Sequence, residues 1–349
     1  TDALGNIIGT MSIDRFHDEY SVGVVQIKTG VINKSFADEL SLGITYGRDK
    51  NNEQHPAKSI NQVFGKYFSE NETKLISTIY KKEFNDFAVN AYLLKGKVQD
   101  TINDAYSRDY NWLGEYTEKS DPTEGELGTK SIFTITDDVT RASLSGKYKL
   151  SPNENITAQY SYNHLTREGN DTLNPNNSSF SSPNWIKKSV LGIEYDNGEL
   201  LNGLEFTVFA KQYIYQGEIK AEETIDSTIV NVSTHVDLNE MGYGTALSYQ
   251  ILPKLRTKFS YEKAFRLPEG GEILGTGKYV LPNADLEAEE SDNINVGILA
   301  EFSSENTLSR FETNYFYRDS KDFIRYVPVR IVYGMYKNLQ KVKTNGLES

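Results

Sequence analysis

The stretch that decides the fold is residues 140–163, TRASLSGKYKLSPNENITAQYSYN. From 142 to 150 its even positions carry Ala, Leu, Gly, Tyr and Leu, whereas the odd positions carry serine or lysine. After a turn at 151–154, the same alternation returns in 155–163. Side chains of a strand point alternately to its two faces. The stretch therefore predicts a β-hairpin with one apolar face and one polar face.

The same alternation recurs along the chain. It is regular at 204–214, 241–251, 255–265 and 294–302, and it is less regular at 37–48, 73–83, 86–98, 186–196 and 307–318. A strand of about ten residues is long enough to cross a bilayer when it is tilted. The sequence therefore predicts an all-β protein with about a dozen strands.

Short turns and long connections alternate between these strands. The short turns are at 151–154, 196–203, 252–254 and 303–306, and the long polar connections are at 99–137, 167–184, 216–238 and 267–287. An outer-membrane barrel has this arrangement because its periplasmic turns are short and its extracellular loops are long. Large soluble barrels, β-helices and sandwiches also alternate. The strand lengths, together with 23 Tyr and 16 Phe, favour an antiparallel transmembrane β-barrel.

Composition excludes several other classes of protein. The 349 residues include 37 Lys+Arg and 49 Asp+Glu, and a net charge of −12 disfavours binding to nucleic acid. The absence of cysteine excludes disulfides, thiol catalysis and thiolate-bound metals. No apolar run approaches the roughly 18 residues that a membrane-spanning helix needs. We therefore expect neither a nucleic-acid partner nor a helical membrane protein.

Catalytic and metal-binding motifs are absent from the sequence. The four histidines are His17, His55, His164 and His235, and no two of them have metal-ligand spacing. His164 ends the apolar face of its strand, so we expect it at the membrane interface. Paired carboxylates such as Glu289 and Glu290 adjoin polar loops and are interpreted as solvated charges. We therefore expect no enzyme activity, no cofactor and no metal site.

The connection 99–137 is the candidate binding site. Its aromatic residues Tyr106, Tyr110, Trp112 and Tyr116 stand among several carboxylates. Rings supply stacking surfaces and carboxylates accept hydrogen bonds, a combination that suits sugars, cationic chelates or peptides. We expect these four residues to bind substrate. The alternative is a loop whose rings pack on neighbouring loops or lie at the membrane interface.

Several segments resemble the motifs of one family. YEKAFRLPE at 261–269, LPNADLEAE at 281–289 and SDNINVG at 291–297 resemble the "F-R-x-P", "N-P-D-L-K-P-E" and "N-x-x-x-G" motifs of TonB-dependent outer-membrane receptors. FYRDSKDFI at 316–324 and NLQKVKTNGLE at 338–348 are similar to two further barrel segments of that family. The chain departs from the pattern at Ala284, where proline is usual, and at 287–288, where Lys-Pro is usual.

That resemblance implies a barrel of about 22 strands, of which this chain supplies about half, filled by a plug domain. VGVVQIKT at 22–29 resembles the last strand of the plug. The resemblance therefore implies that residues 1–34 end the plug and that residues 35–349 form a partial barrel. Edges of an open sheet are not tolerated in lipid, so we expect the remaining strands outside this chain.

The resemblance also implies a function. It implies uptake of a scarce nutrient across the outer membrane of a Gram-negative bacterium, with siderophores, vitamins, peptides and glycans all open as the ligand. The TonB energising complex is the implied partner, through a segment that we expect outside this chain. Outer-membrane lipid and a surface lipoprotein are further expected partners. The alternative function is surface assembly or protein secretion through partner docking.

Overall fold

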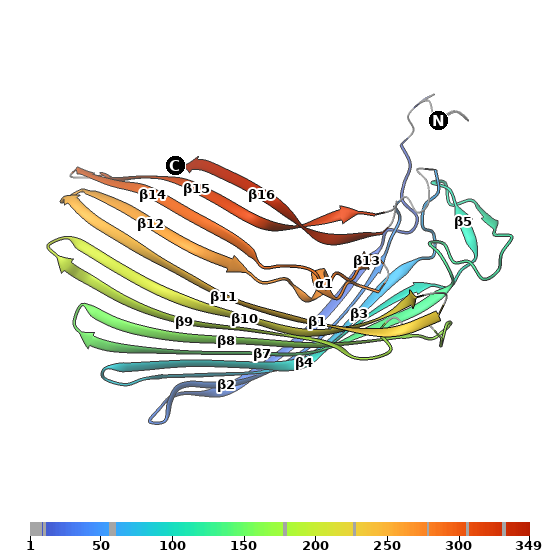
Figure 1. The fold of residues 1–349 in the computed structure, drawn as a ribbon, viewed down its shortest axis with the longest axis horizontal. Helices are drawn as coiled ribbons and strands as arrows, with labels where there is room; N and C mark the ends of the chain where they lie inside the picture. Colours follow the sequence, from blue (N-terminus) through green and yellow to red (C-terminus); the bar gives the residue numbers. More distant parts are fainter. Residues whose placement is uncertain are drawn as a thin grey trace.

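A single large sheet forms most of the structure. The computed structural model describes residues 9, 12–55, 61–176, 180–225, 228–277, 279–304, 307–329 and 333–349. Within these residues 14 strands form one sheet and two short strands form a second. The long strands run side by side along the molecule (Figure 1). The prediction of an antiparallel all-β barrel fold is confirmed, as part of a barrel whose sheet is open within the described residues.

The long strands neighbour one another in the order in which they occur along the chain. In spatial order they are β1 (Tyr20–Lys34), β2 (Ala37–Asn52), β3 (Phe68–Glu83), β4 (Phe87–Asp104), β7 (Ser131–Ser151), β8 (Glu154–Asp171), β9 (Asn184–Leu201), β10 (Leu204–Ile225), β11 (Thr228–Leu252), β12 (Leu255–Arg266), β14 (Glu289–Ser304), β15 (Thr307–Pro328) and β16 (Gly334–Glu348). Each pairs antiparallel with the next, whereas β13 (Val280–Leu281) runs parallel to β16. β5 (Arg108–Tyr110) and β6 (Tyr116–Glu118) form the small sheet.

Short turns gather at one end of the sheet. The turns at 84–86, 152–153, 202–203 and 253–254 lie at the left in Figure 1. The described parts of the connections 53–67, 105–130 and 172–183 lie toward the right, and segment 267–288, with α1, extends from the middle of the view toward the right. We call these the short-turn end and the loop end. No helix of the described residues is a candidate membrane span, and α1 (Gly270–Ile273) has only four residues.

The prediction of a long connection at 216–238 was wrong. Residues 216–238 are not a long loop, because β10 and β11 pair continuously from Leu204↔Tyr249 to Ile225↔Thr228. The segment 225–232 is rich in β-branched residues, which favour extended backbone. Residues 216–225 and 228–238 therefore belong to one long hairpin, in which the side chains of Ile219 and Val236 are buried.

The two faces of the sheet differ in what covers them. Asp137 in β7 accepts two hydrogen bonds of 2.7 Å from Arg167 in β8, which also donates to the backbone oxygen of Gly275. Segment 267–288 therefore packs on the face that carries Asp137, which we call the inner face. The β7–β8 register is unbroken from Asp137 to Lys149, so the polar odd residues of 141–149 share this face.

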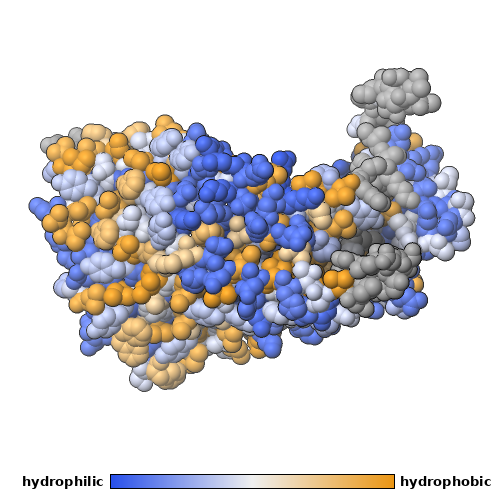
Figure 2. Space-filling view, in the orientation of Figure 1, coloured by the Kyte–Doolittle hydropathy of each residue, from blue (hydrophilic) through white to orange (hydrophobic). Residues whose placement is uncertain are grey.

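The apolar even residues lie on the opposite, outer face, as predicted. Leu144 and Tyr148 on β7 are 51% and 50% exposed, and Leu191 on β9 is 54% exposed. In Figure 2 hydrophobic residues gather toward the short-turn end and hydrophilic residues toward the middle and the loop end. The sheet thus has an apolar outer surface over its short-turn half.

β1 extends the large sheet at its first edge. It pairs with β2 from Tyr20↔Asn51 to Lys34↔Ala37, and the expected boundary after residue 34 lies in the turn between them. The structure therefore places 20–34 in the same sheet as the strands that follow. The assignment of residues 1–34 to a plug stays a prediction.

The largest hydrophobic core lies at the loop end of the inner face. Ile273, Leu274 and Leu286 of segment 267–288 are at most 1% exposed. They belong to one cluster with Phe133 of β7 and Tyr215 of β10. Burying a side chain of this size stabilises a fold by about 1.5–3 kcal/mol. This core fixes segment 267–288 across the loop end.

Candidate functional site

The predicted aromatic loop folds as a hairpin. β5 and β6 pair through Arg108↔Glu118, Asp109↔Thr117 and Tyr110↔Tyr116. Asn111 stabilises the turn, because its side-chain oxygen accepts hydrogen bonds of 2.9 Å from the Leu113 N–H and 3.0 Å from the Glu115 N–H. Asparagine favours turns for this reason. Two of the four predicted residues therefore face each other across a short, ordered ladder.

Tyr110 anchors this hairpin. Its side chain is 5% exposed. Its ring centroid lies 5.4 Å from that of Tyr116 and 6.1 Å from that of Phe16. Gly65 lies so close to the same ring that an added Cβ would collide with it. Tyr110 is thus enclosed by protein and holds the hairpin in place.

The other three predicted residues are more open. Tyr116 is 50% exposed and Tyr106 is 45% exposed. The guanidinium carbon of Arg108 lies 4.2 Å from the Tyr116 ring centroid, and its Nε donates a hydrogen bond of 2.9 Å to Glu118. Trp112 is half-buried in the turn, and Tyr106 precedes β5. The structure brings Tyr110 and Tyr116 into ring contact, whereas Tyr106 has no ring contact with a described residue.

Two buried carboxylates connect this loop to its neighbours, and the sequence analysis missed both. Asp104 accepts hydrogen bonds from the backbone N–H groups of residues 126–128 at 2.6, 3.2 and 3.4 Å. Glu126 accepts from the N–H groups of Gly65 at 2.5 Å and Lys66 at 2.7 Å. Burial raises the pKa of Glu126 to about 7. In the sequence, the signal that could have pointed to this contact region is the pair of glycines at 125 and 128, which flank Glu126.

An aromatic cluster joins two further loops. The rings of Phe64 and Tyr67 stack with centroids 4.5 Å apart, and the Tyr279 hydroxyl donates to that of Tyr67. His17 contacts the backbone oxygen of Tyr67 through Nε2 at 2.6 Å, and burial lowers the pKa of His17. The described parts of the connections 53–67, 105–130 and 267–288 thus contact one another at the loop end.

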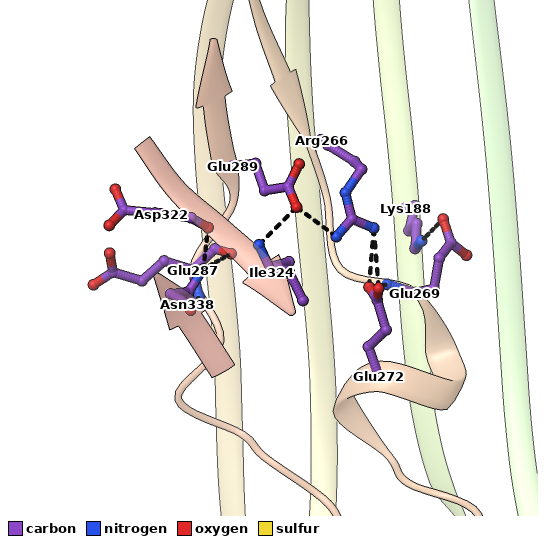
Figure 3. A network of polar contacts seen from close by, with 9 residues as sticks. All are labelled: Lys188, Arg266, Glu269, Glu272, Glu287, Glu289, Asp322, Ile324 and Asn338. Atoms are coloured by element: carbon purple, nitrogen blue, oxygen red, sulfur yellow. Dashed lines mark hydrogen bonds and ion pairs between the residues drawn. The ribbon is translucent and has the colours of Figure 1, made fainter. Parts of the chain in front are cut away.

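A charged network fixes α1 above the inner face (Figure 3). Arg266 Nη1 lies 3.1 and 3.2 Å from the two oxygens of Glu272, and its Nη2 lies 2.8 Å from Glu289. Glu289 also accepts a hydrogen bond of 2.7 Å from the Ile324 N–H. The interpretation of Glu289 as a solvated charge was therefore wrong. Partners more than 20 residues away in the sequence leave its side chain only 12% exposed.

Further polar contacts hold both ends of segment 267–288. Lys188 of β9 forms an ion pair of 2.7 Å with Glu269, at the start of α1. Asn338 of β16 accepts a hydrogen bond of 3.0 Å from the Glu287 N–H and donates to the backbone oxygens of Glu287 and Asp322. Figure 3 shows these contacts on either side of Arg266. The segment is thereby attached to β9, β12, β14 and β16.

A cavity of about 320 Å³ lies beside α1 on the inner face. Arg141, Asn163, Lys188 and Glu269 are among the polar residues that line it. Arg141, Asn163 and Lys188 occupy one row across β7, β8 and β9. The described residues contain no group of side chains suited to hold a metal ion. The loop end thus offers exposed rings outside and a hydrogen-bonding wall inside.

Known proteins share this architecture. The family model described as "TonB dependent receptor-like, beta-barrel" matches residues 26–349. No curated protein matches the chain in sequence. Among solved structures, the copper transporter OprC has a TM-score of 0.66 at 8% identity, and the match covers 95% of this chain and 50% of that one.

Two further structures support the same fold. The FrpB iron transporter from Neisseria meningitidis (F5-1 variant) has a TM-score of 0.64 at 12% identity, over 97% of this chain and 51% of that one. The Serratia marcescens hemophore receptor HasR, as a double mutant with its hemophore HasA and heme, has a TM-score of 0.60 at 14% identity, over 94% of this chain and 51% of that one. The chain spans about half the length of these structures. Because the family model covers nearly all of it, the chain belongs to the TonB-dependent receptor family, of which it forms part of the β-barrel.

Proposed function

We propose that this chain is part of an outer-membrane receptor that takes up a scarce nutrient in a TonB-dependent way. The proposal rests on the arrangement of side chains at the loop end. There, exposed rings of the β5–β6 hairpin stand on a cover of connected loops above a polar inner wall. A transporter needs such an arrangement, because the ligand is captured outside and then passes along polar groups. TonB would engage a part of the receptor other than the described sheet.

Tyr106, Trp112 and Tyr116 are the proposed ligand contacts, and Tyr110 holds the hairpin that presents two of them. Exposed rings stack on flat or apolar ligand groups. Arg108 and Glu118 beside Tyr116 add a cation and a hydrogen-bond acceptor. The structures with a similar fold are named for iron, heme or copper. These names support a metal-carrying ligand, and siderophores are the first class to test.

The family and the matched structures are named as receptors or transporters, which supports a role without covalent chemistry on the ligand. Membership of the family also supports a location in the outer membrane of a Gram-negative bacterium. Surface assembly or secretion, the alternative function, gains no support from these matches.

Metal uptake by living cells tests the proposal. Cells that express the protein under iron or copper limitation should accumulate radioactive metal from chelates, and a proton-motive-force uncoupler should abolish the accumulation. Removing three rings in the variant Y106A/W112A/Y116A should reduce uptake about tenfold, which corresponds to a modest loss of stacking energy.

Leu113→Ala is the matched control, because Leu113 is exposed in the same turn but carries no ring. Its uptake should equal that of the wild type. Uptake that resists the uncoupler would contradict TonB dependence. Unchanged uptake in the triple variant would contradict the assignment of these three rings as ligand contacts.

A further inference from the structure

A row of polar side chains crosses four strands on the outer face. The β-sheet register aligns Lys95 of β4 with Thr140 of β7, Thr140 with His164 of β8, and His164 with Lys187 of β9. Thr140 is an even residue of β7, so the row lies on the same face as Leu144. Neighbouring strands are about 4.8 Å apart, so the row is roughly 15 Å long.

This row marks the limit of the apolar outer surface. On its short-turn side the next positions include Leu93 and Ala142, and Leu93 is 50% exposed. On its loop side, Lys187 Nζ lies 4.8 Å from the centroid of the Trp185 ring. Tyr162 and His164 are in ring contact at 6.4 Å. Aromatic and basic side chains at the end of an apolar band are typical of a membrane interface.

Lys95 and Lys187 form no ion pair with any residue that the structure describes. The next row toward the loop end contains two acidic residues, Asp138 and Glu218, and both already have other partners. Asp138 pairs with Lys97 at 3.5 Å, and Glu218 accepts a hydrogen bond of 3.0 Å from Trp185 Nε1. Within the row itself, the next acidic residue is Asp237, two strands beyond Lys187. The row therefore presents two uncompensated ammonium groups.

Lysines on another part of the outer face differ in this respect. Near the loop end of β12–β16, Lys263 and Lys321 both pair with Glu290, at 3.2 and 3.3 Å. Lys341 and Lys343 both lie within 4.0 Å of Asp319. Carboxylates thus compensate these four lysines. Lys95 and Lys187 of the row on β4–β9 have no such carboxylate partner within the described residues.

We infer that this row binds the phosphate group of an anionic membrane lipid. Lys95 and Lys187 supply positive charge, while Thr140 and His164 can donate hydrogen bonds to the phosphate oxygens. The acyl chains would lie on the apolar surface that begins at Leu93. This inference rests on the proposed membrane location, but it does not depend on which ligand is transported.

Lipid binding to the protein purified from membranes in mild detergent tests the inference. The probe is lipid A with both phosphates, and native mass spectrometry measures the bound fraction. The variant K95Q/K187Q should bind it roughly 25-fold more weakly, at about a factor of five for each lysine. Lipid A without phosphates should bind the wild type as weakly as phosphorylated lipid A binds K95Q/K187Q.

The variant K321Q/K343Q is the matched control, because it also removes two lysines from the outer face. Their carboxylate partners, Glu290 and Asp319, each retain a second lysine. It should bind lipid A like the wild type. Equal binding by K95Q/K187Q and the wild type would overturn the inference, as would an equal loss in the control. Displacement of lipid A by excess inorganic phosphate alone would identify an ion site rather than a lipid site. A failure of metal uptake would leave these results unaffected, so the two proposals fail separately.

Discussion

The two halves of the sheet are held together in different ways. In the short-turn half, backbone ladders join the strands, and outward residues such as Leu144 and Ile193 stay 51% and 58% exposed. In the loop half, side chains such as Phe64 and Ile273 are completely buried, and Arg266 and Asp104 bind groups from other segments. The short-turn half therefore depends on its surroundings to cover its apolar surface, whereas the loop half contains its own core.

A charge on the outer face gives the largest expected effect. Val208 lies on the outer face of β10, in the same row as Tyr148, and is 41% exposed. Val208→Arg should lower the free energy of unfolding from lipid by about 2–4 kcal/mol, because a charge near the bilayer midplane is costly. Gln159→Arg, on the inner face of β8, should cost far less. Urea unfolding from phospholipid vesicles measures both, and equal costs would refute the assignment of faces.

A single added methyl group should disturb the loop half. Gly65→Ala places a Cβ against the Tyr110 ring and should cost about 1–3 kcal/mol by overpacking. Gly271→Ala is the control, because nothing lies within 4 Å of the added Cβ. Limited proteolysis of connection 105–130 reports the change. Equal protection in both variants would show that Tyr110 does not anchor the hairpin.

Removing the charge at the centre of the α1 network should have a smaller effect. Arg266→Met leaves Glu272 and Glu289 without their shared cation, and the Arg266 side chain is 40% exposed. We therefore expect a loss of about 1–2 kcal/mol, less than for a fully buried pair. Hydrogen exchange of segment 267–288 measures it. Arg310→Met, which removes a more exposed pair with Glu312, should change nothing measurable.

The last effect concerns pH. Burial raises the pKa of Glu126 from 4.5 to about 7, so the folded state holds the proton more tightly than the unfolded state. Stability from this group is therefore complete below about pH 4.5 and is lost as the pH rises through 7. Glu126→Gln, which does not titrate, should remove that loss. Protease resistance of connection 105–130 at pH 5.5 and 8, compared between the two proteins, checks this, and an unchanged pH dependence would contradict it.

Local patterns predicted the short-turn half well. The alternation in 140–163 needs no knowledge of the rest of the chain, because each residue's face follows from its neighbours along the strand. The same reasoning failed at 216–238, because the apolar residues on one face of this hairpin, such as Ile219 and Val236, stand among acidic and polar residues that are typical of a loop. Strand periodicity thus predicts those strands in which the alternation stays regular over about ten residues.

The loop half depends on contacts that no local pattern contains. Tyr110 and Tyr116 look alike in the sequence, yet Gly65 and Phe16, far earlier in the chain, enclose only Tyr110. Likewise, Glu289 is buried by Arg266 and by the backbone of Ile324. The candidate binding loop was therefore predictable as a segment. The division of its rings into anchors and exposed contacts required the structure.

The length of β10 has a consequence for recognition of the cell surface. The last apolar residue of its regular outer face is Ile214, and the strand continues to Ile225, about 35 Å further at 3.3 Å per residue. In a bilayer that ends near Ile214, this part of the β10–β11 hairpin would project into the medium. An antibody raised against it could label intact cells, whereas the membrane would hide any epitope on the apolar half of the same two strands.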